Sequence, residues 1–313
     1  MARILVTADY LHPGDAVDAY LRARGHETTH APMTGRRTED ELAALLTGVE
    51  GALIANEPMT AAVLARATAL RAVVRTGVGY DSVDVAAARR RGISVSNLPG
   101  VNANAVAEFT IGLILDASRH LVGLATGVAA GRWPRTDGHE LRGSTLGLVG
   151  FGATARAVVP LARAFGMTVL CSTPRVAEAV PGVEFVDLPT LLARSDVVSL
   201  HAALTGTTRG LIDARALAAM KPTALLVNTA RGPLVDEVAL ADAVRTGRIA
   251  GAALDVTTVE PLPADSVLRG VAGITVYPHM AGQTAEARAA AGHAGATELV
   301  AALAGTPAFR VNP

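Results

Sequence analysis

The second half of the chain carries side chains of types that bind an anion and move a proton. Arg231 follows one short apolar run, Asp255 and Glu260 follow a second, and His279 ends a third. A guanidinium suits a carboxylate, and an imidazole beside a carboxylate suits general acid–base chemistry. Taken singly, these residues also fit structural roles, as a helix cap, a solvated loop charge or a hydrogen-bonded histidine. Their position behind successive apolar runs favours one catalytic site over those separate roles.

A glycine-containing stretch, residues 146–156, ends another apolar run and passes directly into a helical pattern. In a dinucleotide-binding turn the first glycine makes the tight turn, and the second lets the main chain approach the pyrophosphate. Gly150 and Gly152 match these positions, and Ala155 matches the third, where helix and strand pack closely. An ordinary strand-to-helix turn is the alternative. The candidate phosphate-binding residues are Gly150, Gly152, Ala153 and Thr154.

Short apolar runs alternate with helix-compatible segments along the chain, which predicts an α/β fold with doubly wound parallel sheets. Residues 102–124 have helical spacing and predict one long helix, and residues 129–143 predict an arm or loop in which Trp133 is an aromatic anchor. Residues 284–303 predict a helix that returns to the first domain. Because ligands bind beyond the carboxyl ends of the strands in such sheets, the residues that follow each apolar run are the candidates for chemistry.

The 313 residues include 28 basic and 28 acidic side chains, and half of the chain is hydrophobic. Zero formal net charge argues against nucleic acid or an anionic membrane surface as the main partner. Cys171 is the single cysteine, which excludes an internal disulfide and a thiolate metal cluster, and we expect no metal site. The N-terminus lacks a signal-peptide pattern, and no window has the roughly 18 to 20 apolar residues that span a bilayer. We therefore expect a cytoplasmic protein whose partner is a small molecule.

Together these motifs resemble the D-isomer-specific 2-hydroxyacid dehydrogenases, which include glyoxylate and hydroxypyruvate reductases. The matching segments are residues 77–97, 99–115, 146–158, 227–244, 250–256, 259–263 and 278–284. The resemblance covers nearly the whole chain and implies an NAD(P)-dependent enzyme. It also implies a Rossmann dinucleotide-binding domain at residues 99–284 and a smaller flavodoxin-like, substrate-binding α/β domain made of residues 1–98 plus 285–313.

The resemblance assigns roles to the chemical residues. Arg231 corresponds to the family arginine that binds the substrate carboxylate and polarises the keto oxygen. His279 corresponds to the acid/base that exchanges a proton with this oxygen, and Glu260 to its carboxylate partner, which favours the charged imidazole. The backbone amides of Val78 and Gly79 correspond to a carboxylate cradle in the outer domain.

The resemblance also implies residues around the nicotinamide. Asp255 corresponds to the residue that orients the carboxamide. The other residues implied at that end of the cofactor are Ala202, Thr229 and Ala230.

The residue expected to bind the adenosine end of the cofactor differs from the family pattern. An acidic residue that holds the adenosine ribose diol is expected about 20 residues after the glycine turn. This chain has Thr173 there, and Arg175 follows two residues later. A carboxylate would repel a 2′-phosphate, whereas an arginine is able to pair with it, so NADP(H) is favoured over NAD(H). A site that accepts either cofactor is the alternative.

The loop after the 51–55 run bears on the substrate. It carries Asn56 and Glu57 where relatives that act on phosphorylated acids tend to present basic residues. With no cation there, the sequence predicts a small unphosphorylated 2-keto acid, or the matching D-2-hydroxy acid, of the glyoxylate, hydroxypyruvate or pyruvate kind. We expect Glu57 to be a solvent-facing loop residue, with a hydrogen bond to a substrate hydroxyl as the alternative.

Two other functions share these motifs, namely a nucleotide-sensing corepressor-like binding protein and a phosphite dehydrogenase-like enzyme. The presence of the arginine, the glutamate and the histidine favours an enzyme over a corepressor. Family members usually pair through the long helix and the neighbouring arm. We therefore expect a homodimer that uses residues 102–124 and the arm around Trp133.

Overall fold

A computed structural model describes residues 1–33, 37–174 and 179–313 of the chain. The described residues group into two compact units. The first unit combines Met1–Asn102 with Gln283–Pro313, and the second comprises Ala103–Gly282. Each unit contains one parallel sheet with helices on both faces, which confirms the predicted α/β fold class.

The sheet of the first unit has the order β2-β1-β3-β4-β5, and each neighbouring pair is parallel. All four residues of β3 are buried, as expected for a strand that is covered on both faces. The strands are β1 (Arg3–Val6), β2 (Glu27–His30), β3 (Gly51–Ile54), β4 (Ala72–Arg75) and β5 (Ser94–Ser96).

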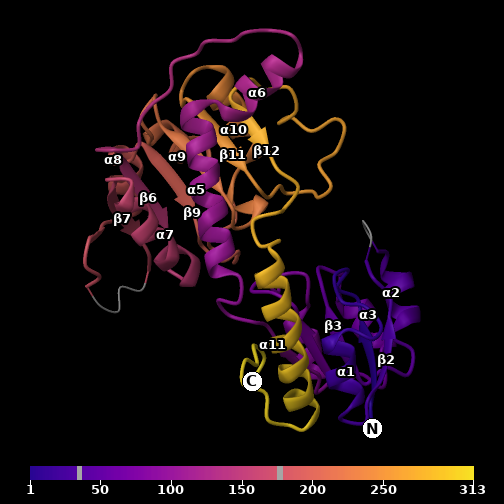
Figure 1. Cartoon of the computed structure of the whole chain (residues 1–313). Coiled ribbons are helices and arrows are strands. Elements are labelled where there is room, and N and C mark those ends of the chain that lie inside the picture. The colour runs from indigo at the N-terminus through magenta and orange to yellow at the C-terminus, as the bar shows by residue number, and fades with distance from the viewer. Residues whose placement is uncertain (34–36, 175–178) are drawn as a thin grey trace. The chain divides into compact units, whose positions relative to one another are not determined.

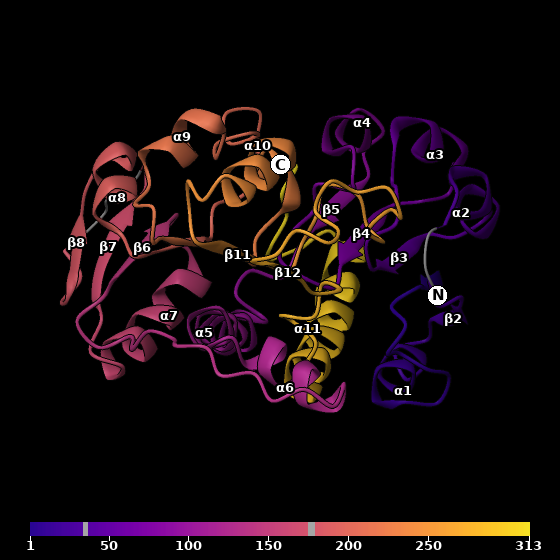
Figure 2. The ribbon, with the colours of Figure 1, turned by 90° about the horizontal axis from the view of Figure 1, so that it is seen from above.

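Helices from the described residues cover both faces of this first sheet. They are α1 (Ala16–Arg22), α2 (Glu39–Leu45), α3 (Ala61–Arg66), α4 (Val85–Arg90) and α11 (Ala285–Leu303). Figure 2 shows α3 and α4 on one face and α1 and α11 on the other. The C-terminal helix lies close on β3 and β4, because a Cβ atom at Gly295 would come within 2.8 Å of the Leu53 side chain.

The sheet of the second unit has seven parallel strands in the order β12-β11-β10-β9-β6-β7-β8. The order reverses between β6 and β9, so the sheet is doubly wound and its switch point lies beside the glycine turn. The strands are β6 (Thr145–Val149), β7 (Thr168–Ser172), β8 (Val183–Phe185), β9 (Val197–Leu200), β10 (Leu225–Asn228), β11 (Gly251–Leu254) and β12 (Ile274–Val276).

The helices of the second unit cover both faces of this sheet, with α5 and α7 on one side and α9 and α10 on the other (Figure 2). A buried core that includes Ile114, Val158 and Leu148 joins α5 and α7 to the strands. The helices are α5 (Ala103–Arg119), α6 (Leu121–Ala129), α7 (Ala153–Ala164), α8 (Leu188–Arg194), α9 (Ala214–Ala219), the 3₁₀ turn η1 (Gly232–Leu234) and α10 (Glu237–Arg245).

The single helix predicted at residues 102–124 is wrong. His120 adopts a left-handed conformation with φ of +56°, which ends α5 and starts α6 at a bend of 65° (Figure 1). The carboxylate of Asp116 accepts a hydrogen bond from the N–H of Val122 and so caps the new helix. No single described helix meets the length and apolarity of a membrane span, although α5 and α6 taken together do.

The stretch after α6 forms an arm without regular structure, as predicted. Trp133 does not anchor it within the chain, because this side chain is 79% exposed. Three further apolar residues on α6 are exposed, namely Leu121, Val122 and Val128.

Candidate active site

The carboxyl ends of the parallel strands in the second unit bring the predicted chemical residues to one edge of its sheet. Gly150 follows β6, Arg231 follows β10, and Asp255 follows β11 directly. His279 lies three residues beyond β12. Residues that are far apart in the sequence thus end neighbouring strands.

Glu260 and His279 form a hydrogen-bonded pair, with 2.7 Å between Glu260 Oε2 and His279 Nδ1. The second oxygen of the carboxylate, Oε1, accepts the N–H of Thr257 at 3.1 Å. Both side chains keep about a third of their surface exposed, at 36% and 35%. The carboxylate therefore binds the imidazole at Nδ1, on one edge of the ring, and the side chain remains partly accessible.

Burial opposes ionisation of Glu260, but other interactions outweigh it. The hydrogen bond and the charge of His279, the N–H of Thr257 and the charge of Arg231 together hold the pKa of the Glu260 carboxyl below its ordinary value. Glu260 is therefore an anion at neutral pH, beside both the imidazole and the guanidinium.

Asp255 organises the loop that carries His279. Its Oδ1 accepts the N–H of Met280 at 2.7 Å, its Oδ2 accepts the N–H of Ala281 at 2.9 Å, and its backbone oxygen accepts the N–H of His279. His279 itself has a φ of +58°, which is uncommon for a residue with a side chain. Three hydrogen bonds to one buried aspartate keep the loop in this conformation.

Arg231 is held by a neighbour that the sequence analysis did not single out. The amide of Asn228, which is buried at the end of β10, accepts the N–H of Ala230 through Oδ1 and donates to the backbone oxygen of Arg231 through Nδ2. A Cβ atom at Gly232 would lie 2.0 Å from the backbone of Thr257. The Arg-Gly sequence therefore packs directly on the segment that leads to Glu260.

The glycine turn fits a dinucleotide. Gly150 has a φ of +94°, and a Cβ atom there would lie 2.8 Å from the backbone of Ala202, so only glycine is accommodated. A Cβ atom at Gly152 would meet nothing within 4 Å, which leaves open space over the start of α7. No side chain among the described residues caps this helix, and its first turn, with Ala153 and Thr154, holds no acidic residue. Free N–H groups at a helix start suit a pyrophosphate.

Three other predicted cofactor residues lie at the same sheet edge. Thr229 and Ala230 follow β10, and Ala202 follows β9 against the glycine turn. Thr229 is 9% exposed, and its hydroxyl lies 3.1 Å from that of Thr110 on α5. Thr173 follows β7 and is partly exposed, whereas Arg175 lies outside the described residues.

His201, which also follows β9, was not anticipated. Its Nε2 lies 2.9 Å from the buried hydroxyl of Ser199, and burial lowers the pKa of His201 to about 4. The imidazole is therefore neutral at pH 7. It adds a polar but uncharged group beside Ala202.

In the first unit, the predicted carboxylate cradle follows β4. The backbone oxygen of Gly77 accepts the N–H of Leu98, and that of Val78 accepts the side-chain amide of Asn97 at 2.7 Å. Within the described part of the chain, no hydrogen bond uses the N–H groups of Val78 or Gly79. Because hydrogen bonds engage the backbone oxygens of Gly77 and Val78, the consecutive N–H groups of Val78 and Gly79 remain available to an anion.

Two predictions about the loop after β3 are wrong. Glu57 is not solvent-facing but fully buried, and it forms an ion pair with Arg37, with 3.8 Å between Arg37 Nη1 and Glu57 Oε1. A cation is also present beside Asn56, because Arg75 at the end of β4 donates from Nη2 to the Asn56 side-chain oxygen. Strand order explains the error, since β3 and β4 are neighbours in the sheet and Arg75 pairs with Ile54.

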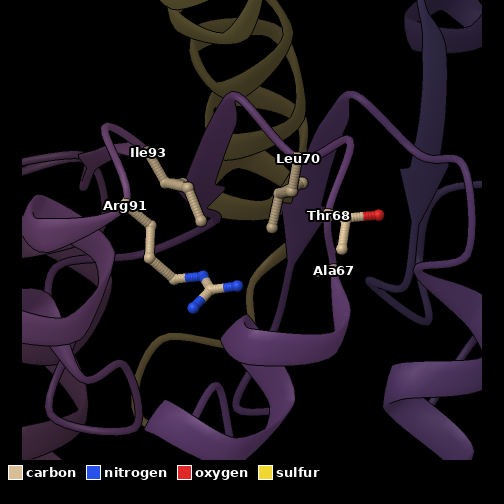
Figure 3. Close-up of a pocket in the computed structure, with 5 residues that line it drawn as sticks. All are labelled: Ala67, Thr68, Leu70, Arg91 and Ile93. Carbon is tan, nitrogen blue, oxygen red and sulfur yellow. The ribbon is translucent and has the colours of Figure 1, made fainter.

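A separate hollow of about 260 Å³ lies on the first unit, between the ends of α3 and α4. Figure 3 shows the five residues that line it, which are Ala67, Thr68, Leu70, Arg91 and Ile93. Arg91 donates to the backbone oxygen of Ala65. The lining offers one hydroxyl, one cation and apolar surface, and it holds none of the predicted site residues.

Three polar residues at or near the site were not predicted from the sequence. Asn228, Thr110 and His201 are polar residues in otherwise apolar segments. A polar residue in an apolar segment is a sign that could have been read from the sequence, because a buried polar residue needs a hydrogen-bond partner. The identity of each partner was not available, since the Thr110 and Thr229 hydroxyls are 119 residues apart in sequence.

Known proteins resemble this chain along most of its length. The family described as D-isomer specific 2-hydroxyacid dehydrogenase, NAD binding domain, matches residues 111–281. The chain is 40% identical over 279 residues to a glyoxylate reductase of Thermofilum pendens, which covers 86% of this chain and 80% of that protein. It is 45% identical over 257 residues to an (S)-sulfolactate dehydrogenase of Chromohalobacter salexigens, covering 79% and 83%. The crystal structure of the TT0316 protein from Thermus thermophilus matches with a TM-score of 0.90, 38% identity and 99% coverage of both chains.

Proposed function

We propose that this chain, which belongs to the D-isomer-specific 2-hydroxyacid dehydrogenase family, transfers a hydride between a nicotinamide cofactor and a small 2-keto acid. Family membership makes it an NAD(P)-dependent hydroxyacid dehydrogenase. The observation that carries the residue-level proposal is the 2.7 Å hydrogen bond between Glu260 and His279 at the carboxyl edge of the sheet, with the Arg231 charge nearby.

His279 is the proposed acid in the reducing direction. Its Nδ1 is bound to Glu260, so Nε2 carries the proton that the keto oxygen takes up as the carbonyl carbon receives the hydride. The anionic Glu260 stabilises the imidazolium before the transfer and fixes the orientation of the ring. In the oxidising direction the same nitrogen takes the proton from the hydroxyl group.

Arg231 is the proposed substrate-binding cation. Its planar guanidinium suits a bidentate contact with the carboxylate and a contact with the keto oxygen, which would polarise the carbonyl group. In the first unit, we propose that the N–H groups of Val78 and Gly79 bind a substrate carboxylate. Their neighbouring carbonyls are engaged, which supports this role.

The nicotinamide dinucleotide supplies or accepts the hydride when it is bound. The proposed pyrophosphate site is the turn at Gly150 and Gly152 with the start of α7. Its support is the open space at Gly152 and the N-terminus of α7, where the N-cap residue makes no side-chain hydrogen bond. Asp255 and Thr229 are the proposed polar contacts at the nicotinamide end.

We propose NADP(H) as the preferred cofactor, because Thr173 leaves no carboxylate where a 2′-phosphate would be repelled. The test is Arg175→Ala, with binding of NADPH and NADH measured by fluorescence titration. We expect the variant to bind NADPH about tenfold more weakly with little change for NADH. Equal losses for both cofactors would contradict the contact with the phosphate.

The proposed substrate is a small unphosphorylated 2-keto acid such as glyoxylate, hydroxypyruvate or pyruvate. One observation favours a second candidate class, 2-keto acids with an additional anionic group. The guanidinium of Arg75 folds over Gly77, with Nη1 only 2.7 Å from the place of a Cβ atom there, and so lies beside the Val78 amide. One relative is named as an (S)-sulfolactate dehydrogenase, and the 2-keto acid that corresponds to sulfolactate belongs to this second class.

The experiment that tests the function is a substrate panel run with both NADPH and NADH. It contains glyoxylate, hydroxypyruvate, pyruvate, 3-sulfopyruvate and 3-phosphohydroxypyruvate, and the measurement is loss of absorbance of the reduced cofactor. We expect turnover with at least one of the first four acids. Binding of the cofactor without turnover of any acid would favour a nucleotide-sensing protein instead.

We also propose that the protein forms a homodimer through α6 and the arm after it. The support is the exposed apolar surface of Leu121, Val122, Val128 and Trp133. Val128→Asp should shift the mass measured by light scattering from dimer to monomer. Val238→Asp is the matched control, because Val238 is an exposed valine on a different helix, α10. A wild-type monomer, or equal effects of both variants, would contradict the proposal.

A further inference from the structure

Two buried threonine hydroxyls connect α5 to the carboxyl end of β10. Thr110 on α5 has no exposed surface, and its Oγ1 lies 2.7 Å from the backbone oxygen of Val106 one turn earlier. The same Oγ1 lies 3.1 Å from Oγ1 of Thr229. Thr229 follows β10 directly, at the carboxyl edge of the sheet, and keeps 9% of its surface exposed.

The direction of these hydrogen bonds follows from counting protons. A threonine hydroxyl has one proton to donate and two lone pairs that accept. A backbone oxygen has no proton, so Thr110 must be the donor in its 2.7 Å bond to Val106. This bond is a common one for threonine in a helix. With its proton used, Thr110 is the acceptor in the second bond, and Thr229 is the donor.

The consequence for Thr229 is that its hydroxyl proton points inward, toward α5. The rest of this hydroxyl oxygen carries lone pairs, which accept hydrogen bonds. Asp255, which directly follows the adjacent strand β11, is an acceptor as well, because its two carboxylate oxygens bind the N–H groups of Met280 and Ala281. This part of the edge therefore offers acceptors to a ligand and no side-chain hydroxyl proton.

We propose that Thr110 is a positioning residue that fixes the hydroxyl of Thr229 as an acceptor for the carboxamide N–H of the nicotinamide. The proposal rests on the proposed function, because it takes the nicotinamide to lie at Thr229. A primary amide has two N–H donors, so a sheet edge that presents hydrogen-bond acceptors favours an amide over groups without a donor. A carboxylate in the same place would meet lone pairs and negative charge, and a methyl ketone would provide no donor.

The experiment compares two cofactors in equilibrium binding by calorimetry. One is NADPH, or NADH if it binds more tightly, and the other is the 3-acetylpyridine analogue of the same dinucleotide, in which the amide NH₂ is a methyl group. Thr110→Val removes the acceptor for the Thr229 proton, which is then free to turn outward toward the amide donor. Thr110→Ser keeps the hydroxyl and is the matched control.

We expect Thr110→Val to bind the nicotinamide form about five- to tenfold more weakly, which corresponds to one net hydrogen bond of about 1 to 1.4 kcal/mol. Binding of the acetylpyridine form should change by less than about twofold, since that analogue has no donor to lose. Thr110→Ser should bind both forms like the wild type. The ratio of the two affinities is the readout, and a general packing defect would not change it.

Thr229→Val provides a second route if Thr110→Val does not fold. It removes the acceptor itself, so it should show the same selective loss, and the double variant should lose no more than either single one. Equal weakening of both cofactors, or unchanged binding of the nicotinamide form, would overturn the proposal. A wild-type protein that binds no nicotinamide cofactor would instead overturn the proposed function, so the two failures are distinguishable.

Discussion

At the carboxyl edge of the second unit's sheet, chemical side chains are held by other side chains, whereas at the edge of the first unit's sheet the main chain presents the donors. Glu260 fixes His279, and Asn228 fixes the backbone on both sides of Arg231. In the first unit, the Val78 and Gly79 amides are presented because hydrogen bonds engage the carbonyls beside them. The difference fits the two proposed tasks, since proton transfer requires an oriented side chain, whereas oriented main-chain dipoles are able to contribute to the binding of a carboxylate.

The largest expected effect comes from removing the proposed acid. His279→Asn keeps a residue that tolerates a positive φ but has no titratable group. Loss of general acid catalysis should lower kcat by about 10² to 10⁴. Cofactor binding, measured by titration, should stay within about threefold of the wild type, because the loop amides remain bound to Asp255. Turnover near the wild-type rate would remove His279 from the catalytic role.

A smaller loss is expected when the partner of the imidazole is neutralised. Glu260→Gln should lower kcat by about 10- to 100-fold, since the ring keeps a hydrogen-bond partner but loses the charge that stabilises the imidazolium.

The same substitution tests the pH dependence of stability. The pKa of Glu260 is lowered in the folded protein, so its ionised form adds stability above the ordinary value of 4.5 and loses it as the pH falls through the folded pKa. The free energy of unfolding in urea should be about 1 kcal/mol lower for Glu260→Gln at pH 7, a modest figure because the pair is partly exposed. The gap should close below the folded pKa. A constant gap from pH 7 to pH 3 would contradict this account.

A third prediction concerns the support of Arg231. Asn228→Asp keeps the acceptor for the Ala230 amide but loses the donor to the Arg231 backbone oxygen. We expect kcat/KM for the keto acid to fall about tenfold, mainly through KM, because the guanidinium is less well positioned. Rates should be measured over a range of glyoxylate concentrations, and Tm should be measured by thermal melting. A fall in activity that merely follows a fall in Tm would point to a general structural defect.

An effect of the same size, but confined to one substrate, is expected in the first unit, where we propose that an anion is recognised. Arg75→Met should lower kcat/KM for 3-sulfopyruvate about tenfold and leave glyoxylate within about twofold, because only the former has a second anion to pair. Arg90→Met, which removes an exposed cation from α4, is the control. Equal effects of Arg75→Met on kcat/KM for both acids would show that Arg75 does not select between them. The proposed difference in task between the two sheet edges would then lose this support.

Much of this molecule was predictable from local patterns. The apolar runs that were expected to form strands did so, and the glycine turn lies at the switch point of a doubly wound sheet. The helix break at His120 was not predictable, because the apolar spacing continues through it and the cap is the side chain of Asp116. The burial of Glu57 and the cation beside Asn56 were missed because both depend on the neighbouring strand and on Arg37, not on the loop itself.

The sequence by itself determined the fold class, the family and the types of residue at each strand end, because hydrophobic period, glycine positions and chemical type are properties of a few consecutive residues. The tertiary structure alone decided which atoms meet. It joined Oε2 of Glu260 to Nδ1 of His279, turned both oxygens of Asp255 toward the loop amides, and placed the Thr110 hydroxyl of α5 beside that of Thr229. These outcomes depend on distances between segments that lie far apart in the chain, and local patterning carries no information about such distances.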